Sequence, residues 1–247
     1  MSVFLFKDID LSKISGQIGF DRNIQDRKKK SRESELRKMK YEWRKKDKDI
    51  YLPPTKPVVL EDTEKLYIAV EGRGNPNGPA FEKDVQILYA LSYTIRMMPK
   101  KGITPEGYYE YTVFPLEGIW DLDEEGRKLN YLDKDHLVYK LMIRQPDFVT
   151  KEVFAKAVEM TKEKKKDLDI DKAKLETIAD GLTVQMMHIG SYDDEPESFA
   201  IMEKFCEENG LRRIDKRHRE IYISDPRRVS PEKLKTVLRF KVERITE

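Results

Sequence analysis

Residues 66–74 read LYIAVEGRG and residues 182–190 read LTVQMMHIG, so a run of strand-forming side chains ends in a glycine at two places that are 116 residues apart. Turn residues follow each run, and apolar residues then recur at three- and four-residue steps, which predicts a helix. Two more strands are predicted after each helix. The order strand–helix–strand–strand therefore occurs twice, and we interpret it as one duplicated unit.

The predicted elements place the two copies at about residues 57–148 and 175–243. A helix at about residues 150–166 joins them, and Thr150 suits its N-cap because it lies three residues before Val153. We predict an α/β (α+β) domain over residues 57–247, with helices on one face of an antiparallel sheet. The expected elements are strands at 65–70, 109–116, 137–144, 182–189, 220–224 and 236–242, and helices at 81–99 and 199–210.

The first 56 residues differ from the rest in charge. Residues 21–48 hold thirteen Lys or Arg and six Asp or Glu, whereas the whole chain has 48 basic and 46 acidic residues. This segment predicts a charged helix, and the prolines at 53–57 predict an extended linker. Nucleic-acid binding, with Tyr41 and Trp43 stacking on bases, is the weaker alternative, because a charged helix before a linker is usually solvated or packed on its own domain. The sequence shows no helix-turn-helix pattern, so we do not expect direct control of transcription.

The composition excludes several classes of protein. The single cysteine, Cys206, cannot form an internal disulfide, which favours the reducing cytoplasm. No apolar run is long enough to span a membrane, so we expect no membrane partner. The sequence has no HExxH, GxSxG or P-loop motif, and its three histidines lack metal-type spacing. We therefore predict no metal site and no cofactor, and no pattern indicates an oligomeric state.

Aromatic residues and methionines are frequent on the predicted strands, and Glu220 lies among them. Ile221 and Ile223 share one face of a strand, so Glu220 and Tyr222 point to the opposite face. If the helices cover the isoleucine face, Glu220 lies in an aromatic cup on the helix-free face. A carboxylate there can attract a cation or exchange a proton with a reacting centre. Core packing of the aromatic residues and a solvent-exposed Glu220 are the alternatives.

Three motifs of the second copy resemble those of a known family. They are VQMMHIGSYDDEP at 184–196, EIYISDPRR at 220–228 and EKLKTVLR at 232–239. With the duplicated order, they resemble the GyrI-like small-molecule-binding domain over about residues 57–242. LEGIW at 116–120 and LMIRQPDF at 141–148 resemble its stand-alone, long-form branch. The resemblance implies a curved antiparallel sheet of two SHS2-type halves, with helices on one face and a ligand cavity on the other.

The family includes multidrug-binding domains of transcription regulators, a gyrase inhibitor, and hydrolases that open cyclopropanoid genotoxins. The resemblance implies that Glu220 is the central glutamate of the cavity. We expect the protein to bind hydrophobic, often cationic small molecules in this cavity, for sequestration or detoxification. Hydrolysis of cyclopropanoid compounds is the alternative function. The hydrolases share a tyrosine–glutamate pair, for which we choose Tyr139 before Tyr111 or Tyr93. The expected cavity residues are Glu220, Trp120, Tyr139, Tyr222, Tyr111, Phe114 and Met186.

Overall fold

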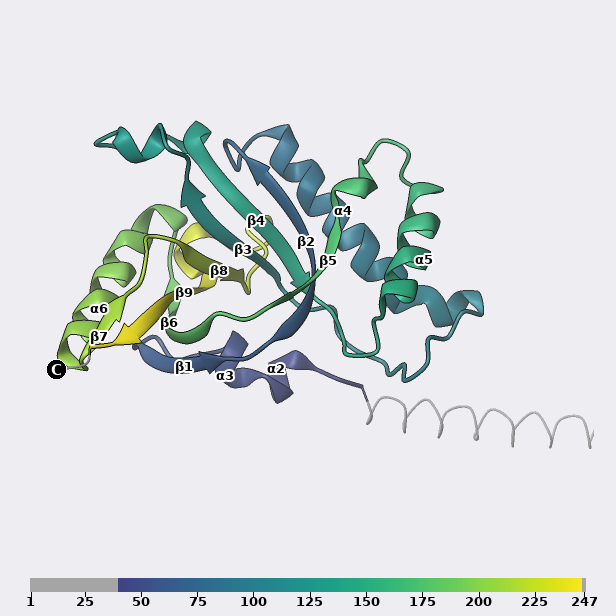
Figure 1. Cartoon of the computed structure of the whole chain (residues 1–247), viewed down its shortest axis with the longest axis horizontal. Helices are drawn as coiled ribbons and strands as arrows, with labels where there is room; N and C mark the ends of the chain where they lie inside the picture. Colours follow the sequence, from purple (N-terminus) through teal and green to yellow (C-terminus); the bar gives the residue numbers. More distant parts are fainter. Residues whose placement is uncertain (1–39, 246–247) are drawn as a thin grey trace, which may run out of the picture. The chain divides into compact units, whose positions relative to one another are not determined.

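The computed structural model describes residues 40–245 of the chain. Eight strands of this part form one curled antiparallel sheet in the order β1-β6-β9-β8-β3-β4-β2-β5, and β7 pairs with β9 (Figure 1). The predicted fold class is confirmed. The strands are β1 (Val58–Asp62), β2 (Lys65–Arg73), β3 (Leu116–Leu122), β4 (Leu137–Arg144), β5 (Lys174–Ile178), β6 (Gly181–Ile189), β7 (Leu211–Arg213), β8 (His218–Tyr222) and β9 (Lys235–Arg244).

The strand register agrees with the duplicated order. In the first half, Tyr67 of β2 pairs with Arg144 of β4. In the second half, Thr183 of β6, which lies 116 residues after Tyr67, pairs with Lys241 of β9. The three central strands of each half therefore have the same arrangement, β2-β4-β3 in one and β6-β9-β8 in the other.

The two halves meet where β3 pairs with β8. Gly118 pairs with Leu141 in the first half, and Glu220 pairs with Leu238 in the second. Leu141 and Leu238 are 97 residues apart, and so are Arg144 and Lys241, which pair with Tyr67 and Thr183. Leu141 and Leu238 are therefore equivalent positions of β4 and β9. Their partners Gly118 and Glu220 are then equivalent as well. They are also directly paired with each other across β3 and β8. A local pseudo-twofold axis therefore passes between Gly118 and Glu220.

Two helices cover one face of the sheet. Helix α4 packs on β2 and β4, and α6 packs on β6 and β7, while α5 packs on α4 (Figure 1). Under α6, the apolar core contains Val184, Met186 and Leu238 of the strands, with Met202 and Cys206 of the helix. The helices are α2 (Trp43–Lys46), α3 (Lys48–Tyr51), α4 (Pro79–Met97), α5 (Lys151–Lys162) and α6 (Glu195–Glu208).

The N-cap of α5 is confirmed, whereas the bounds of several predicted elements need correction. Thr150 accepts a hydrogen bond from the backbone of Val153 at 3.3 Å, as predicted. The predicted strand at 109–116 is wrong, because β3 begins only at Leu116. Pro115 lacks the N–H that a strand needs, and the aromatic rings before it pack around Phe148 instead. Helix α6 begins four residues earlier than predicted, with Pro196 in its first turn.

Residues 42–57, which lie in the predicted extension and linker, pack against the rest of the domain. Trp43 is 3% exposed and donates a hydrogen bond to the carbonyl of Val113 at 3.1 Å. Tyr51 is fully buried, and the carbonyl of Ile50 accepts from Arg239. The Trp43 ring is therefore not free to stack on a base. Most of the basic segment, up to residue 39, lies outside the described residues.

The face of the sheet opposite α4 and α6 holds a buried network of charges. Arg219 is 2% exposed and contacts Glu117 at 3.1 Å and Asp180 at 2.9 Å. Arg239 contacts Asp62 at 3.5 Å. Each carboxylate of this network thus has a buried arginine as its counter-charge.

Among the described helices, none is long and apolar enough to cross a membrane.

Candidate functional site

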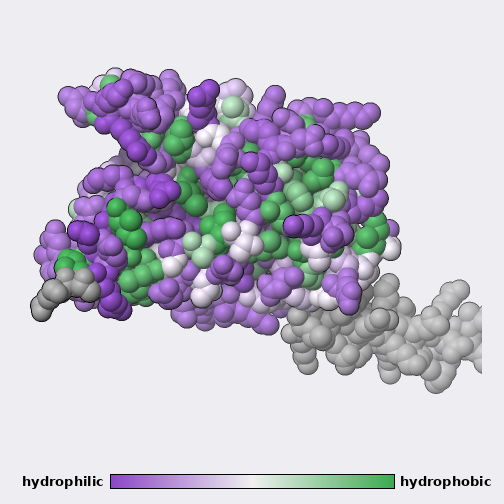
Figure 2. Space-filling view, in the orientation of Figure 1, coloured by the Kyte–Doolittle hydropathy of each residue, from purple (hydrophilic) through white to green (hydrophobic). Residues whose placement is uncertain are grey.

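A large cavity lies between α4 and α6, on the face of the sheet that these helices cover. Its volume is about 2160 Å³, and its lining includes Phe81 of α4, Phe199 of α6 and Glu220 of β8. The side shown in Figure 2 has hydrophilic edges, and apolar side chains show mainly in its middle. This placement differs from the expected one on the helix-free face. The reason is that the other face is not free either, because Arg219 and its partners fill it.

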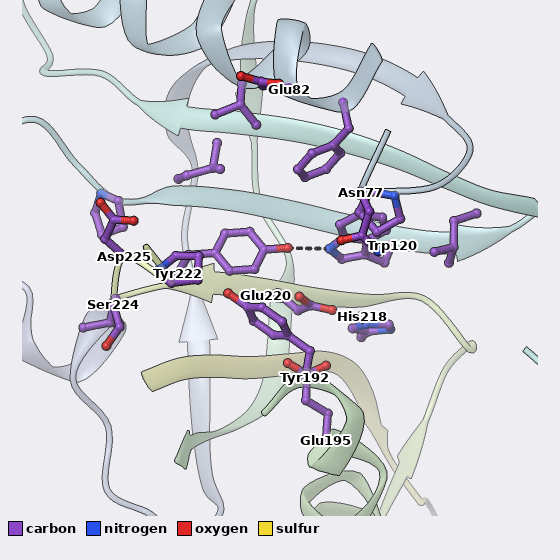
Figure 3. Close-up of a pocket in the computed structure, with 18 of the residues that line it drawn as sticks. Asn77, Glu82, Trp120, Tyr192, Glu195, His218, Glu220, Tyr222, Ser224 and Asp225 are labelled. Carbon is purple, nitrogen blue, oxygen red and sulfur yellow. Dashed lines mark hydrogen bonds and ion pairs between the residues drawn. The ribbon is translucent and has the colours of Figure 1, made fainter. Parts of the chain in front are cut away.

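Two carboxyl groups and one imidazole meet at the floor of this cavity. Glu220 and His218 lie two residues apart on β8 and point to the same side, with 3.0 Å between His218 Nε2 and Glu220 Oε1. Glu195, in the first turn of α6, approaches them from the opposite wall (Figure 3). It is 6% exposed, and its Oε1 has no hydrogen-bond partner among the described residues.

A hydrogen bond between two aromatic side chains spans the pseudo-twofold axis beside Glu220. Trp120 of β3 donates its indole N–H to the Tyr222 hydroxyl of β8 at 2.9 Å (Figure 3). Gly118 makes this contact possible, because a Cβ there would lie 2.8 Å from Trp120 Nε1 and 3.3 Å from the Tyr222 hydroxyl. The glycine of the first half thus leaves room beside the glutamate of the second half.

Burial and neighbouring charge shift the ionisation of this cluster. Burial and the adjacent Glu220 raise the pKa of Glu195 to about 10. Burial and the charge of Glu220 also raise the pKa of Tyr192 to about 12, and they raise the pKa of Tyr222 well above its ordinary value. At neutral pH, Glu195 therefore keeps its proton and both tyrosines remain hydrogen-bond donors.

Aromatic rings form the walls on both sides of the carboxyl pair. Phe81 stacks on Trp120 with ring centroids 5.8 Å apart. Tyr192 meets Tyr222 edge to face at 6.1 Å, and its hydroxyl makes no hydrogen bond within residues 40–245. Phe199 lies edge to face against the His218 ring at 4.9 Å. The arrangement suits flat, apolar molecules that carry a polar or charged group toward the floor.

The predicted site residues fall into two groups. Four of them line the cavity: Glu220, Trp120, Tyr222 and Phe114. Tyr139, Tyr111 and Met186 are outside the lining.

The residues outside the lining have partners elsewhere. The Tyr139 hydroxyl donates to Asp84 Oδ2 at 3.1 Å, and burial with the nearby Asp84 raises its pKa. Tyr111 is 1% exposed and packs near Phe148. Met186 belongs to the apolar core under α6. Tyr93, the third tyrosine considered, lines the cavity and is 47% exposed.

The sequence analysis misses Glu195, His218 and Tyr192 as site residues. Glu195 and Tyr192 lie in the segment 190–196, where the acidic residues resemble an ordinary helix start. His218 shares the alternation of Glu220 and Tyr222, so the period of two could have found it once β8 was extended by two residues. Glu195 has no such signal, because only the packing of α6 against β8 brings it to the floor.

The same three side chains are the ones in residues 40–245 that could hold a metal ion. One donor atom each from Glu195, His218 and Glu220 lies within 4.8 Å of the other two. The prediction of no metal rests on histidine spacing in the sequence. Histidine spacing cannot reveal this set of ligands, because the set contains only one histidine and combines a helix residue with two strand residues.

Comparisons with known proteins show which family and which solved structures this chain resembles. The GyrI-like small molecule binding domain family matches residues 55–243. A hydrolase from Listeria innocua is 38% identical, with 82% of this chain and 100% of that chain covered and a TM-score of 0.75. A conserved Listeria innocua protein is 39% identical, with the same coverage and a TM-score of 0.78. The hydrolase encoded by lin2189 of Listeria innocua is 39% identical, with coverages of 83% and 100% and a TM-score of 0.77. No curated protein matches the chain.

Proposed function

The chain belongs to the family of GyrI-like small-molecule-binding domains, and we propose that it is a hydrolase of hydrophobic, electrophilic small molecules. The observation that carries this proposal is the pair of carboxyl groups, Glu195 and Glu220, at the floor of an aromatic cavity. Two relatives that are 38% and 39% identical over their full length are described as hydrolases, which supports the same reaction type.

Glu220 is the group that activates water in this proposal. Its carboxylate lies at the floor of the cavity and is held by His218 at 3.0 Å. A carboxylate in that position can accept a proton from a water molecule while the water oxygen attacks the substrate. The aromatic walls would hold the reacting carbon above the carboxylate.

The Tyr192 hydroxyl is placed to stabilise the negative charge that develops on the substrate. The Tyr222 hydroxyl accepts from Trp120 and donates its own proton to Glu220, and the Tyr139 hydroxyl donates to Asp84. The hydroxyl of Tyr192 has no such partner among the described residues, and its ring lines the cavity. We therefore assign the tyrosine of the expected tyrosine–glutamate pair to Tyr192 rather than to Tyr139.

A cyclopropane conjugated to a carbonyl is the substrate class that fits these roles and the family resemblance. Water oxygen bonds to one ring carbon, the strained carbon–carbon bond breaks, and its electron pair moves to the carbonyl oxygen. Tyr192 donates a hydrogen bond to that oxygen, and the proton taken by Glu220 returns to the product. The net reaction is the addition of one water molecule, without oxidation or reduction.

Mass spectrometry of the ring-opened water adduct tests the proposal. The purified full chain is incubated with a cyclopropanoid alkylator, and multiple turnovers are expected. Glu220→Gln should lower turnover by about 10²–10⁴-fold, because it removes the base. Tyr192→Phe should lower it by about 10²-fold. Glu208→Gln and Tyr131→Phe, which change exposed side chains, are the matched controls.

Binding without turnover is the second candidate function. Within residues 40–245, no lysine or arginine forms an ion pair with Glu195 or Glu220, so a flat organic cation could supply the missing positive charge. Titration with a rhodamine-type cation measures this. If one molecule binds per chain and no water adduct forms, the protein sequesters its ligand and is not a hydrolase. Undiminished turnover in Glu220→Gln would reject the proposed mechanism.

A further inference from the structure

We propose that Glu195, His218 and Glu220 bind one divalent transition-metal ion such as Zn²⁺, and that this ion inhibits the hydrolysis proposed above. Only the second clause rests on the proposed function. The first concerns the affinity of the folded chain for a metal ion and is independent of any substrate.

The geometry of the three donors is close to that of a metal site. All three donor atoms lie within 4.8 Å of one another, and His218 Nε2 is 3.0 Å from Glu220 Oε1. Zinc bonds to imidazole nitrogen and carboxylate oxygen at about 2.0–2.2 Å, which places tetrahedral ligands roughly 3.4 Å apart. Small rotations of the side chains thus suffice to bring all three donors onto one ion.

A second observation points to a missing cation. Glu195 is 6% exposed, and its Oε1 has no hydrogen-bond partner among the described residues. The only ion-pair partner of Glu220 in this part of the chain is His218. Within residues 40–245, no lysine or arginine pairs with either carboxyl group, whereas buried acidic groups are normally paired or bound to a metal. Binding of the ion would release the proton of Glu195, because a carboxyl group binds a metal ion in its deprotonated form.

The donor set selects the class of ion. Calcium and magnesium prefer sites made of oxygen ligands, so an imidazole nitrogen favours zinc, cobalt and similar ions. Three protein ligands leave at least one coordination position open toward the cavity. The Phe199 ring, 4.9 Å from the His218 ring, shields the ligand from solvent on one side.

Occupancy of this site conflicts with the role proposed for Glu220. A carboxylate oxygen that is bonded to a metal ion cannot at the same time accept a proton from water, and the ion occupies the place where that water would lie. Binding of Zn²⁺ should therefore lower turnover in proportion to occupancy. Chelation with EDTA should restore it.

Titration with Co²⁺, followed by its visible absorption, tests the metal site directly. The full chain is first treated with EDTA and transferred to metal-free buffer. We expect saturation at one ion per chain and displacement of Co²⁺ by Zn²⁺. His218→Gln and Glu195→Gln should each weaken binding at least tenfold. His136→Gln, which changes the partly exposed pair with Asp123, should bind as the wild type does.

The outcomes separate the two proposals. Equal Co²⁺ affinity of the wild type and His218→Gln, with both folded by circular dichroism, would overturn the metal site. Turnover measured in EDTA tests the hydrolase alone, because no ion is present. Turnover that is unchanged or raised by stoichiometric Zn²⁺ would overturn the inhibitory role.

Discussion

Adjacent residues of β8, Arg219 and Glu220, lie on opposite faces of the same sheet and belong to two different kinds of buried charge. On the face of Arg219, the carboxylates of Glu117, Asp62 and Asp180 contact arginines. On the face of Glu220, two carboxyl groups meet a single histidine. The first cluster is neutralised by the protein itself, whereas the second is left for a proton, a ligand or an ion.

This difference separates stability from function. A buried charge that is paired within the protein contributes to the fold, and breaking the pair leaves an uncompensated charge. Carboxyl groups that face each other in a cavity without a lysine or arginine partner destabilise the fold, and such groups are typical of functional sites. We therefore expect substitutions on the two faces to have opposite effects on stability and activity.

The largest expected effect is the loss of stability in Arg219→Met. The variant leaves Glu117 and Asp180 without their guanidinium partner in a buried site. We expect the free energy of unfolding to fall by about 3–5 kcal/mol, as measured by urea denaturation. Arg212→Met, which removes an exposed ion pair with Glu243, is the control and should change it by less than about 1 kcal/mol. Similar losses in both variants would contradict the comparison.

Gly118→Ala should have the next largest effect. The new methyl group would lie 2.8 Å from Trp120 Nε1, so the hydrogen bond from Trp120 to Tyr222 has to shift. We expect a loss of about 1–3 kcal/mol in unfolding free energy and a change in tryptophan fluorescence. Combination with Trp120→Phe should cost less than the sum of the two single changes, because the clash is relieved. Strict additivity would show that the clash is not the cause.

The duplicated order of the strands and the face that Glu220 shares with Tyr222 follow from the sequence, whereas the side of the cavity does not. Alternation shows that Glu220 and Tyr222 share a face, and the 116-residue offset predicts the duplicated strands. Alternation does not show which face the helices cover, and Ile221 gave the wrong indication because the face it shares with Arg219 is buried as well. The approach of Glu195 depends on how α6 packs on β8, which no local pattern encodes.

Glu195→Gln should raise stability by a smaller amount. It removes one of two facing buried carboxyl groups, and we expect a gain of about 0.5–2 kcal/mol in EDTA at neutral pH. The pKa of Glu195 is raised from 4.5 to about 10 in the folded state. The wild type therefore loses stability as pH rises through this window, and glutamine lacks this loss. The gain should grow from pH 5 to pH 9. A gain that shrinks with rising pH would contradict the assignment.

The most direct test compares turnover and stability in one variant, Glu220→Gln, with the cyclopropanoid substrate present and EDTA in the buffer. The free energy of unfolding gives the folded fraction, so turnover can be expressed per folded molecule. The account predicts a protein at least as stable as the wild type whose turnover is lower by about 10²-fold or more. A destabilised variant that keeps the turnover of the wild type would show that Glu220 serves the fold and that the function lies elsewhere.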